Sequence, residues 1–328
     1  MYESIVAEFL TALTVSTLVC AATIIAIARS KLAGMFADVP NARSLHKTPT
    51  PRVGGIGIVV GLLCGWLIWP STVNWWLILP LLGLFTVSLL DDVRQLSVRV
   101  RLSVHWVAAV MLVIGSNVLD QQGILAALAV MLGTVWMTNL YNFMDGSDGL
   151  AGGMAVIGFG CYGVGAWQAG DSDIAVMSAA IVGAALGFLH FNFPKAKVFL
   201  GDSGSIPLGF LAMAIGLWGW LRDDWAVWFP LMVFSPFIVD ATVTLVKRTL
   251  RGASITEAHR DHYYQRLVRM GMLHRKVAYL EFSLMLAAGA SSLTVSGQSA
   301  PALLLMTWLA IYTFLMLWID VVWSRKAH

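Results

Sequence analysis

Charge is what this sequence has least of, because only 12% of its 328 residues are Asp, Glu, Lys or Arg. A soluble domain usually has about 25%. Hydrophobic residues make up 58% of the chain, and the mean hydropathy is +0.77. This combination excludes an ordinary soluble globular protein and predicts an integral membrane protein.

Cysteine is also scarce, and Cys20, Cys64 and Cys161 all fall within apolar stretches. The spacings of a disulfide framework and of a structural zinc site are both missing. We expect reduced thiols that pack among apolar side chains. Convincing internal repeats are missing too, so residues 1–328 are expected to form a single domain.

Long apolar stretches fill most of the chain. A membrane-spanning helix needs roughly 20 mainly apolar residues, and about eleven stretches approach this length. The sequence therefore predicts an all-α, polytopic membrane protein. Its expected transmembrane helices lie at about residues 8–28, 54–70, 75–90, 102–118, 122–141, 150–169, 174–191, 206–221, 226–246, 277–297 and 302–323.

Basic residues set the expected orientation. With the N-terminus outside the cell, the inner loops hold 20 of the 21 Lys and Arg residues, and only Arg222 lies outside. Cytoplasmic loops are enriched in Lys and Arg. We therefore expect a cytoplasmic C-terminus and cytoplasmic positions for the longest loops, about residues 29–53, 192–205 and 247–276.

Aspartates gather at the cytoplasmic ends of these expected helices. Carboxylates are costly near hydrocarbon and usually mark function there. Because the acids and the long loops share one face, we expect the chemistry at that face. The five aspartates are Asp91, Asp92, Asp145, Asp148 and Asp202.

Asp91 and Asp92 are adjacent, and neighbouring side chains on a helix diverge by about 100°. In one interpretation, one carboxylate faces a metal or nucleotide and the other faces a proton donor. In the other, both lie at a solvated helix end that pairs with Arg94. The second interpretation is the stronger one for an isolated pair.

Asn139, Asn142, Asp145 and Asp148 recur every three residues and share a broad stripe of a helix. The neighbouring Gly146 lets a ligand approach the backbone. Asn, Asp and Gly also favour turns and caps. So many polar groups beside a membrane helix favour a binding site over a turn alone.

Residues 199–205 separate two apolar stretches. Asp202 offers the hard oxygen ligand that Mg²⁺ prefers, while nearby amide groups and hydroxyls can hold phosphate. Ser203 and Ser205 are equally suited to cap the following helix. Phe199 is either a core aromatic residue or a surface on which a nucleotide base stacks.

Two further segments bring cations to the same face. His46, Arg52 and the Gly54-Gly55 pair can form a diphosphate-binding surface, although the glycines alone favour close helix packing. His259 and His262 are spaced to reach one site. For these histidines a phosphate clamp is favoured over a solvated loop or a zinc site.

Asp240 lies inside an expected span, about seven residues before Lys247. It either pairs with a basic residue or lines the catalytic cleft.

Taken in order, these segments resemble the polyprenyl-phosphate N-acetylhexosamine-1-phosphate transferases, multi-span enzymes that begin bacterial envelope glycans. The resemblance covers about residues 38–270. Each motif is weak alone, but the ordered set is highly specific. The motifs are Asp38-Val-Pro-Asn-Ala-Arg43-Ser-Leu-His46, Pro49-Thr-Pro-Arg52-Val-Gly-Gly55, Asp91-Asp92, Asn139 to Leu150, Ala196 to Ser205, and His259 to Arg266.

The resemblance implies that a UDP-N-acetylhexosamine donates its sugar 1-phosphate to undecaprenyl or another polyprenyl phosphate, and that UMP leaves. It implies Mg²⁺ or Mn²⁺ held by Asp202 and Asp145, and uracil stacked on Phe199. The implied catalytic residues are Asp91, Asp92, Asp145 and Asp202. The implied substrate-binding residues are His46, Arg52, Asn139, Asn142, Asp148, Lys197, Phe199, His259, Arg260 and His262.

The resemblance also implies a bacterial inner-membrane protein that acts at the cytoplasmic face and binds no nucleic acid. Relatives are often dimeric, and the small residues Gly158, Gly160, Gly163 and Gly165 suit either a homodimer contact or packing within the chain. The Pro-Asn-Ala-Arg and Pro-Thr-Pro-Arg features place the chain nearer the O-antigen and common-antigen branch than the muramoyl-pentapeptide branch. In the latter branch three consecutive histidines are usual. This chain departs from that pattern, because Asp261 precedes His262 and only His259 and His262 remain.

Two other classes of membrane protein compete with this one. A secondary transporter of an anionic solute needs ionisable groups along a path across the membrane, and few lie in the outer halves of the expected spans. A Mg-dependent prenyl or CDP-alcohol transferase typically has fewer spans and a denser aspartate repeat within one helix. The sequence favours the sugar-phosphate transferase over both.

Overall fold

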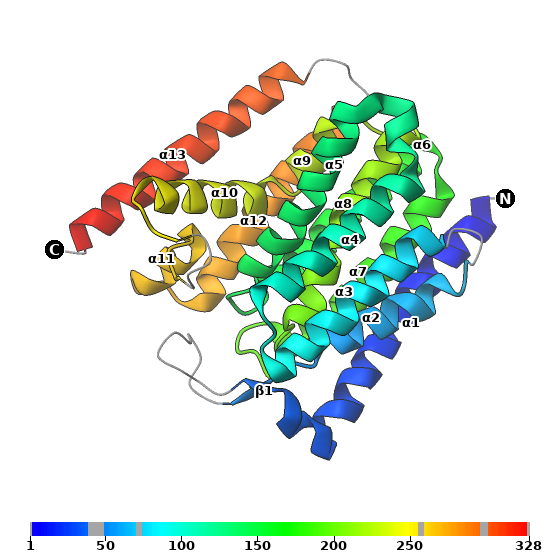
Figure 1. The fold of residues 1–328 in the computed structure, drawn as a ribbon, viewed down its shortest axis with the longest axis horizontal. Coiled ribbons are helices and arrows are strands. Elements are labelled where there is room, and N and C mark those ends of the chain that lie inside the picture. The colour runs from blue at the N-terminus through cyan, green and yellow to red at the C-terminus, as the bar shows by residue number, and fades with distance from the viewer. Residues whose placement is uncertain (1, 39–48, 70–73, 255–258, 296–300, 327–328) are drawn as a thin grey trace.

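The computed structural model describes residues 2–38, 49–69, 74–254, 259–295 and 301–326, and nearly all of them are helical (Figure 1). Two short strands, β1 (Ala37–Asp38) and β2 (Thr50–Pro51), pair antiparallel. The helices are α1 (Tyr2–Ala28), the 3₁₀ helix η1 (Lys31–Phe36), α2 (Gly54–Trp66), α3 (Trp75–Arg94), α4 (Val98–Ser116), α5 (Val118–Phe143), α6 (Leu150–Ala169), α7 (Ser172–Asn192), α8 (Asp202–Leu221), α9 (Trp228–Val233), α10 (Ser235–Leu250), α11 (Tyr263–Arg269), α12 (His274–Leu293) and α13 (Ala302–Lys326).

Eight helices in the described ranges are long and apolar enough to cross a membrane. The prediction of an all-α, polytopic membrane protein is therefore confirmed. Each of the eleven predicted segments contains helix, but α2, α10 and α12 are not among the eight. The number of crossings and the orientation stay predictions. The eight helices are α1, α3, α4, α5, α6, α7, α8 and α13.

The expected span 226–246 is broken in two in the structure. Helix α9 ends at Val233, and α10 begins at Ser235 with Pro236 in its first turn. Proline has no backbone N–H to continue a preceding helix, whereas its fixed φ suits the first turn of a new one. The break lets α10 run at an angle to its neighbours (Figure 1).

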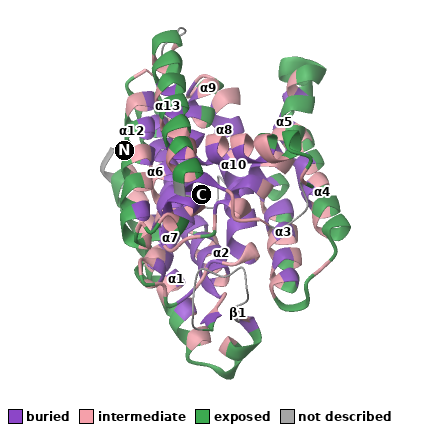
Figure 2. Cartoon of the chain, turned by 90° about the vertical axis from the view of Figure 1, so that its left-hand side faces the viewer, coloured by how far each residue is buried: buried purple, intermediate pink, exposed green. Residues whose placement is uncertain are grey.

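Helix α8 forms the centre of the bundle and packs against α5, α3 and α2. In its apolar stretch 83% of the residues are buried, compared with 17% in α13. Figure 2 shows this contrast as a buried interior inside a rim of exposed helix faces. The exposed side chains of α13 include Leu303, Leu309 and Phe314, as expected for a helix that faces lipid.

Helices α1, α2 and α7 approach one another closely because glycines line their contacts. A Cβ atom at Gly183 would lie 2.2 Å from the backbone oxygen of Leu13, and one at Gly61 would lie 2.7 Å from that of Ser16. Small residues are the usual means by which membrane helices bring their backbones together. These three helices form a closely packed side of the bundle.

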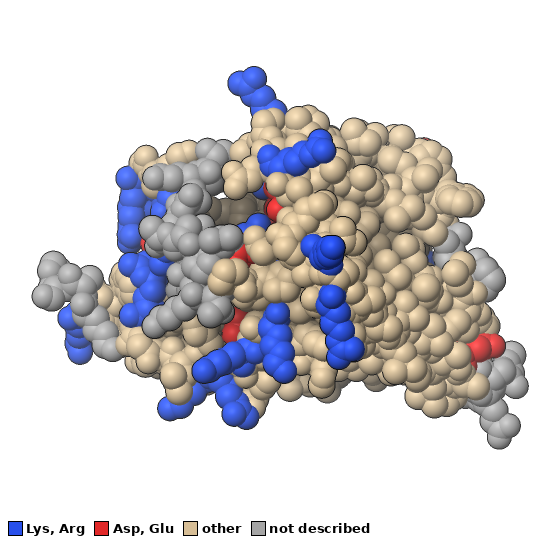
Figure 3. Space-filling model, turned by 90° about the horizontal axis from the view of Figure 1, so that it is seen from below, with Lys and Arg blue, Asp and Glu red and all other residues tan. Residues whose placement is uncertain are grey.

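The β1–β2 pair and the loop after α7 lie at one end of the bundle. Figure 3 shows Lys and Arg side chains gathered over that part of the surface, with carboxylates visible between them. The opposite part of this view is almost free of charge. The uneven distribution that the sequence indicated is thus present in three dimensions.

Candidate active site

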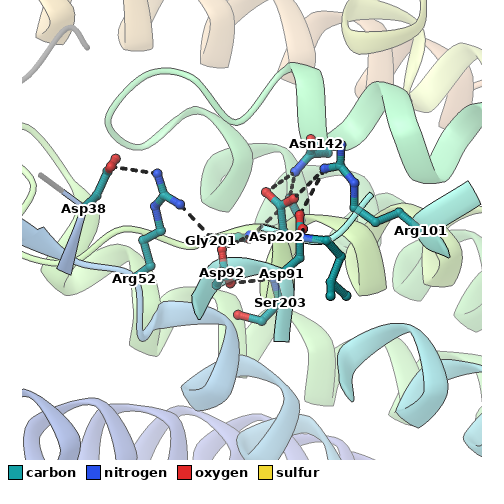
Figure 4. Close-up of polar contacts among 11 residues, drawn as sticks. Asp38, Arg52, Asp91, Asp92, Arg101, Asn142, Gly201, Asp202 and Ser203 are labelled. Carbon is teal, nitrogen blue, oxygen red and sulfur yellow. Dashed lines mark hydrogen bonds and ion pairs between the residues drawn. The ribbon is translucent and has the colours of Figure 1, made fainter. Parts of the chain in front are cut away.

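Segments far apart in the sequence bring polar side chains together at this end of the bundle (Figure 4). They come from β1, the link between β2 and α2, the last turn of α3, the first turn of α4, the last turn of α5 and the first residue of α8. We call this group the Asp202 cluster. Its members are Asp38, Arg52, Asp91, Asp92, Arg101, Asn142 and Asp202.

Asp92 caps helix α8. Its two carboxylate oxygens accept the backbone N–H groups of Asp202, at 3.1 Å, and of Ser203, at 3.0 Å. Its side chain is only 1% exposed. A carboxylate at a helix N-terminus satisfies free N–H groups and interacts favourably with the helix dipole. Asp92 therefore fixes the backbone that carries Asp202.

Gly201 makes this cap possible. Its φ of +75° is a conformation that residues with a side chain rarely adopt, and a Cβ atom there would lie 2.7 Å from Oδ2 of Asp92. Only glycine meets both the conformational and the steric requirement. The Gly-Asp-Ser-Gly sequence thus has a local structural reason in addition to its chemistry.

Asp91 points in another direction, as expected for adjacent residues on a helix. Its Oδ1 accepts the N–H of Leu96 at 2.5 Å, and its Oδ2 lies 3.0 Å from Nη1 of Arg101. The carboxylate therefore braces the short connection between α3 and α4. The interpretation of a solvated helix end paired with Arg94 is wrong, because Asp91 is buried and its cationic partner is Arg101.

Asp202 is the most accessible acid of this cluster, with a quarter of its side chain (25%) exposed. The side-chain amide of Asn142 donates to its Oδ1 at 2.8 Å. Nη1 of Arg101 lies 3.4 Å from its Oδ2. These two donors hold the carboxylate in one orientation while leaving part of it open to a ligand.

Arg52 joins the two sides of the cluster. Its guanidinium lies 2.7 Å from Oδ1 of Asp38 and 3.9 Å from Oδ1 of Asp92. About a third of its side chain (35%) is exposed. Arg52 thus presents a cation beside Asp202 and is suited to an anionic ligand.

The start of α2 packs directly on the loop that leads into α8. The N–H groups of Gly54 and Gly55 donate to the carbonyl oxygens of Phe199 and Leu200 at 3.0 and 2.8 Å. A Cβ atom at Gly55 would lie 2.3 Å from the backbone nitrogen of Gly204. The close-packing interpretation of the glycine pair is therefore confirmed. The Phe199 side chain is half-buried beside this contact.

Asp145 follows α5 and is half-buried. Burial raises its pKa well above the ordinary range, and the nearby carboxylates of Asp202 and Asp92 raise it further. Like charges that are gathered in a partly buried site disfavour ionisation. The arrangement therefore favours a ligand that brings positive charge.

The donor chemistry fits a magnesium ion. Mg²⁺ is usually bound by one or two carboxylates together with substrate phosphates and water, and not by a complete protein cage. In the described part of the chain, no three Asp, Glu, His or Cys side chains surround a common point. Asp202 and Asp145 are suited to be the two carboxylates of such a shared site.

Asp148 and the loop after α7 are joined by hydrogen bonds. Oδ2 of Asp148 accepts the N–H of Ala196 at 3.0 Å. Asn192 accepts the N–H of Gly149 and donates to the carbonyl of Val198. Asp148 thus braces the loop, and Lys197 on the same loop is exposed.

Asn139 bonds away from the Asp202 cluster. Its side-chain amide lies 3.1 Å from Nδ1 of the buried His105 and donates to the carbonyl of Val135. Of the polar stripe that the sequence indicated, Asn142 contacts Asp202 directly, whereas Asn139 joins α5 to α4 one turn earlier.

His262 and Asp240 form a buried support at the start of α11. Both are under 10% exposed, and Nδ1 of His262 lies 3.3 Å from Oδ1 of Asp240. The same carboxylate group accepts the N–H groups of Tyr263 and Tyr264. Of the two roles open from sequence, Asp240 therefore pairs with a basic residue and caps a helix.

His259 and Arg260 precede this support and are half-buried. Burial and the adjacent His262, whose ring centroid is 4.9 Å away, lower the pKa of His259 to about 4. His259 is therefore suited to be a neutral hydrogen-bonding group at neutral pH. His46, the remaining predicted phosphate ligand, lies outside the described residues.

Arg101 is the principal residue of the cluster that sequence reasoning did not select. It lies nine residues after Asp92 and opens the next apolar helix, so it looked like one more positive residue at a membrane border. The charge pattern of the sequence contained the signal that could have identified Arg101. Carboxylates gathered at one end of a bundle need a cation, and Arg101, in the first turn of the adjoining helix, pairs with two of them.

Fold and site together define a polytopic membrane protein with an acidic, cation-balanced site at one end of its bundle. Comparisons with known proteins identify the family. Residues 74–219 match the family described as Glycosyl transferase family 4. The chain belongs to this family of membrane transferases.

Several curated relatives match over most of their length. A probable undecaprenyl-phosphate N-acetylglucosaminyl 1-phosphate transferase of Bacillus subtilis is 30% identical, covering 73% of this chain and 71% of the relative. A decaprenyl-phosphate N-acetylglucosaminephosphotransferase of Mycobacterium tuberculosis is also 30% identical, covering 81% and 78%. The undecaprenyl-phosphate alpha-N-acetylglucosaminyl 1-phosphate transferase of Yersinia pestis is 28% identical, covering 74% and 72%.

Proposed function

We propose that this protein transfers N-acetylhexosamine 1-phosphate from a UDP-sugar to undecaprenyl or another polyprenyl phosphate and releases UMP. The observation that carries the proposal is the Asp202 cluster at the end of a membrane bundle. In it the accessible Asp202 carboxylate pairs with Arg101, and Asp92, which caps the Asp202 backbone, lies beside Arg52. The long matches to relatives with named N-acetylglucosamine substrates support the same reaction.

The chemistry fits these residue types. An oxygen of the acceptor phosphate attacks the phosphorus that carries the sugar, and the bond from that phosphorus to the oxygen of UMP breaks. Such a transfer needs in-line positioning and neutralised charge more than a protein nucleophile. A phosphomonoester with a second pKa of about 6 is already largely ionised at neutral pH. We therefore propose direct attack by the lipid phosphate.

We assign the roles as follows. Asp202 and Asp145 would hold Mg²⁺, which would supply positive charge to the donor diphosphate. Arg52 and Arg101 stabilise the phosphate oxygens, and Phe199 stacks on the uracil ring.

Asp91 and Asp92 have positioning roles in this proposal. Both oxygens of each carboxylate already accept hydrogen bonds or an ion pair inside the protein. Asp92 fixes the start of α8, and Asp91 orients Arg101 toward Asp202. Neither needs to take a proton from an acceptor that is already ionised.

The location follows from the substrates. A polyprenyl tail lies in the bilayer, whereas a nucleotide sugar comes from water, so the reaction belongs at the membrane surface. We propose the cytoplasmic face of a bacterial inner membrane, because Lys and Arg side chains gather on one part of the surface and 20 of the 21 basic residues fall in the loops expected on that side. The product would begin an O-antigen or a related envelope glycan.

Product identity tests this proposal. Purified protein is mixed with undecaprenyl phosphate, Mg²⁺ and, in turn, UDP-GlcNAc and other UDP-N-acetylhexosamines, and the released nucleotide is identified by chromatography. UMP together with a lipid-linked sugar diphosphate is the expected result. Release of UDP would mean ordinary glycosyl transfer and would overturn the reaction. A folded preparation that binds no UDP-sugar would overturn the donor class.

A further inference from the structure

A second polar cluster joins the C-terminal helix to the loop region beside the site. Asp320 is the single acid of α13, in an otherwise apolar sequence that ends with Ser324, Arg325 and Lys326. An ionisable residue in an apolar helix usually has a function and a definite partner. Nothing in the reaction proposed above uses Asp320.

The Asp320 carboxylate gathers donors from two other helices. Nη1 of Arg266, on α11, lies 2.7 Å from its Oδ1. Its Oδ2 accepts the Tyr263 hydroxyl at 3.2 Å and is paired with the ammonium group of Lys247 on α10. Arg266 is only 5% exposed. Loss of the carboxylate would leave a buried cation without its counter-charge, which is costly.

Helix α11 depends on such contacts for its position. It has seven residues, and a helix this short is not stable without packing and caps. Asp240 accepts the N–H groups of its first two residues. Asp320 accepts hydrogen bonds from the side chains of Tyr263 and Arg266. The guanidinium of Arg266 also lies 4.8 Å from the centre of the Tyr263 ring, which stiffens this face.

The other side of α11 contacts residues 143–146, which directly follow Asn142 of the Asp202 cluster. The Tyr264 hydroxyl donates to the carbonyl of Phe143 at 3.1 Å. A Cβ atom at Gly146 would lie 2.1 Å from that hydroxyl, so Tyr264 is in close contact with the backbone there. Phe143 follows Asn142, which donates to Asp202. A continuous set of contacts thus runs from α13 to the Asp202 cluster.

We propose that Asp320 is a positioning residue, which through α11 and Tyr264 holds the 142–148 segment in the geometry that binds the nucleotide sugar. The kinetic part of this inference rests on the function proposed above, whereas the structural coupling does not. Asp92 and Arg101 reach Asp202 by other routes. Loss of Asp320 therefore acts mainly on donor binding and less on the transfer step.

The test combines kinetics with hydrogen exchange in lipid nanodiscs. Asp320→Asn is expected to raise KM for the UDP-sugar about 2- to 30-fold with a smaller change in kcat, the range typical of coupling through packed contacts. It is also expected to speed amide exchange in residues 259–269 and 143–148. Asp320→Glu keeps the charge and should restore both quantities toward wild type.

Arg222→Gln is the matched control. It removes an ion pair with Asp171 at the other end of α8, where Arg222 lies 2.8 Å from the carboxylate, and it should change neither readout. Should Asp320→Asn fail to fold, Tyr263→Phe removes a single donor to Asp320 and should show the same changes to a smaller extent.

Three results would decide against the inference. Unchanged KM and unchanged exchange in residues 143–148 would overturn it, as would faster exchange confined to α11. A loss of activity in Asp320→Asn that Asp320→Glu does not restore would indicate a merely structural role. If the wild-type protein transferred no sugar phosphate, the proposed function would fail, and the exchange data alone would still decide whether Asp320 positions the 142–148 segment.

Discussion

The side-chain nitrogen of Asn142 donates to Oδ1 of Asp202 at 2.8 Å and to the Ser205 hydroxyl at 2.9 Å. Asn142 lies in the last turn of α5 and Asp202 begins α8, so one amide group joins two central helices at the candidate site. The amide therefore sets the direction in which the accessible carboxylate presents its oxygens.

Asn142→Leu removes this donor with little change in side-chain volume. We expect kcat/KM to fall about 10- to 100-fold, the usual cost of losing a partner that orients a functional carboxylate. The assay is UMP release at several Mg²⁺ concentrations, with thermal unfolding as the measure of folding. Wild-type kinetics in the variant would show that Asp202 needs no orientation by Asn142.

Asp202→Asn keeps the shape of the side chain but removes its charge. Turnover is expected to drop at least about 100-fold, because a neutral side chain would hold Mg²⁺ less tightly and the negative charge of the reacting phosphates would no longer be neutralised. Mn²⁺ binding, followed by electron paramagnetic resonance, should weaken in parallel. Since Asn still accepts a hydrogen bond, the melting temperature should change little. Near-normal turnover would remove Asp202 from the metal site.

Phe199→Ala tests the stacking assignment. Base stacking on an aromatic side chain contributes about 1–3 kcal/mol, so KM for the UDP-sugar should rise about 5- to 100-fold while kcat changes less. The backbone bonds of Phe199 to Pro51 and Gly54 do not involve its ring. Phe199→Tyr retains the ring and should behave like wild type. An unchanged KM in the alanine variant would leave Phe199 as a packing residue.

Gly55→Ala tests the close contact between α2 and α8. The added methyl group would lie 2.3 Å from the backbone nitrogen of Gly204, so the helices must separate, at a cost of about 1–3 kcal/mol. Gly160→Ala is the matched control, because no atom of a neighbouring helix lies within 4 Å of a Cβ atom there. The melting temperature should fall for the first variant and not for the second. Equal values would show that α2 moves freely.

Asp224, at the opposite end of the molecule from the Asp202 cluster, should make stability depend on pH. Burial and the neighbouring Asp171 raise its pKa to about 7. The folded protein therefore binds a proton that the unfolded chain releases near its ordinary pKa of about 4. The contribution of Asp224 to stability is then highest below about pH 4, falls as the pH rises to about 7 and is constant above.

Asp224→Asn removes this titration while preserving the shape of the side chain. Relative to wild type, the variant should become more stable as the pH is raised from about 5 to about 8. Thermal unfolding in detergent across this range is the measurement. A stability difference that does not vary with pH would mean that Asp224 is ionised normally.

Composition and the spacing of apolar stretches were sufficient to predict the class of fold. A helix that crosses hydrocarbon must be long, apolar and internally hydrogen-bonded, so its sequence is recognisable without knowledge of its neighbours. The break at Phe234 was missed because Pro236 suits the first turn of a new helix as well as an interior kink. Which of these outcomes occurs depends on packing that no single segment reveals.

The roles of the candidate-site residues were less predictable, because they also depend on how the helices pack. Asp91, Asp92 and Asp202 stand out because carboxylates are rare in such a chain, but their roles depend on partners that are distant in sequence. Arg101 pairs with both Asp91 and Asp202 only after α3, α4 and α8 have packed. Likewise, His262 resembles an exposed phosphate ligand until Asp240 is found beside it.

The cap that Asp92 places on α8 has a consequence for biosynthesis. The carboxylate and the N–H group of Asp202 that it accepts are separated by 110 positions in the chain. Helices α4, α5, α6 and α7 are synthesised and inserted between them. A nascent chain that ends after α7 thus has Asp92 without the two N–H groups that its carboxylate accepts. The protein gains its reactive centre late in translation, when most of its membrane helices are already in place.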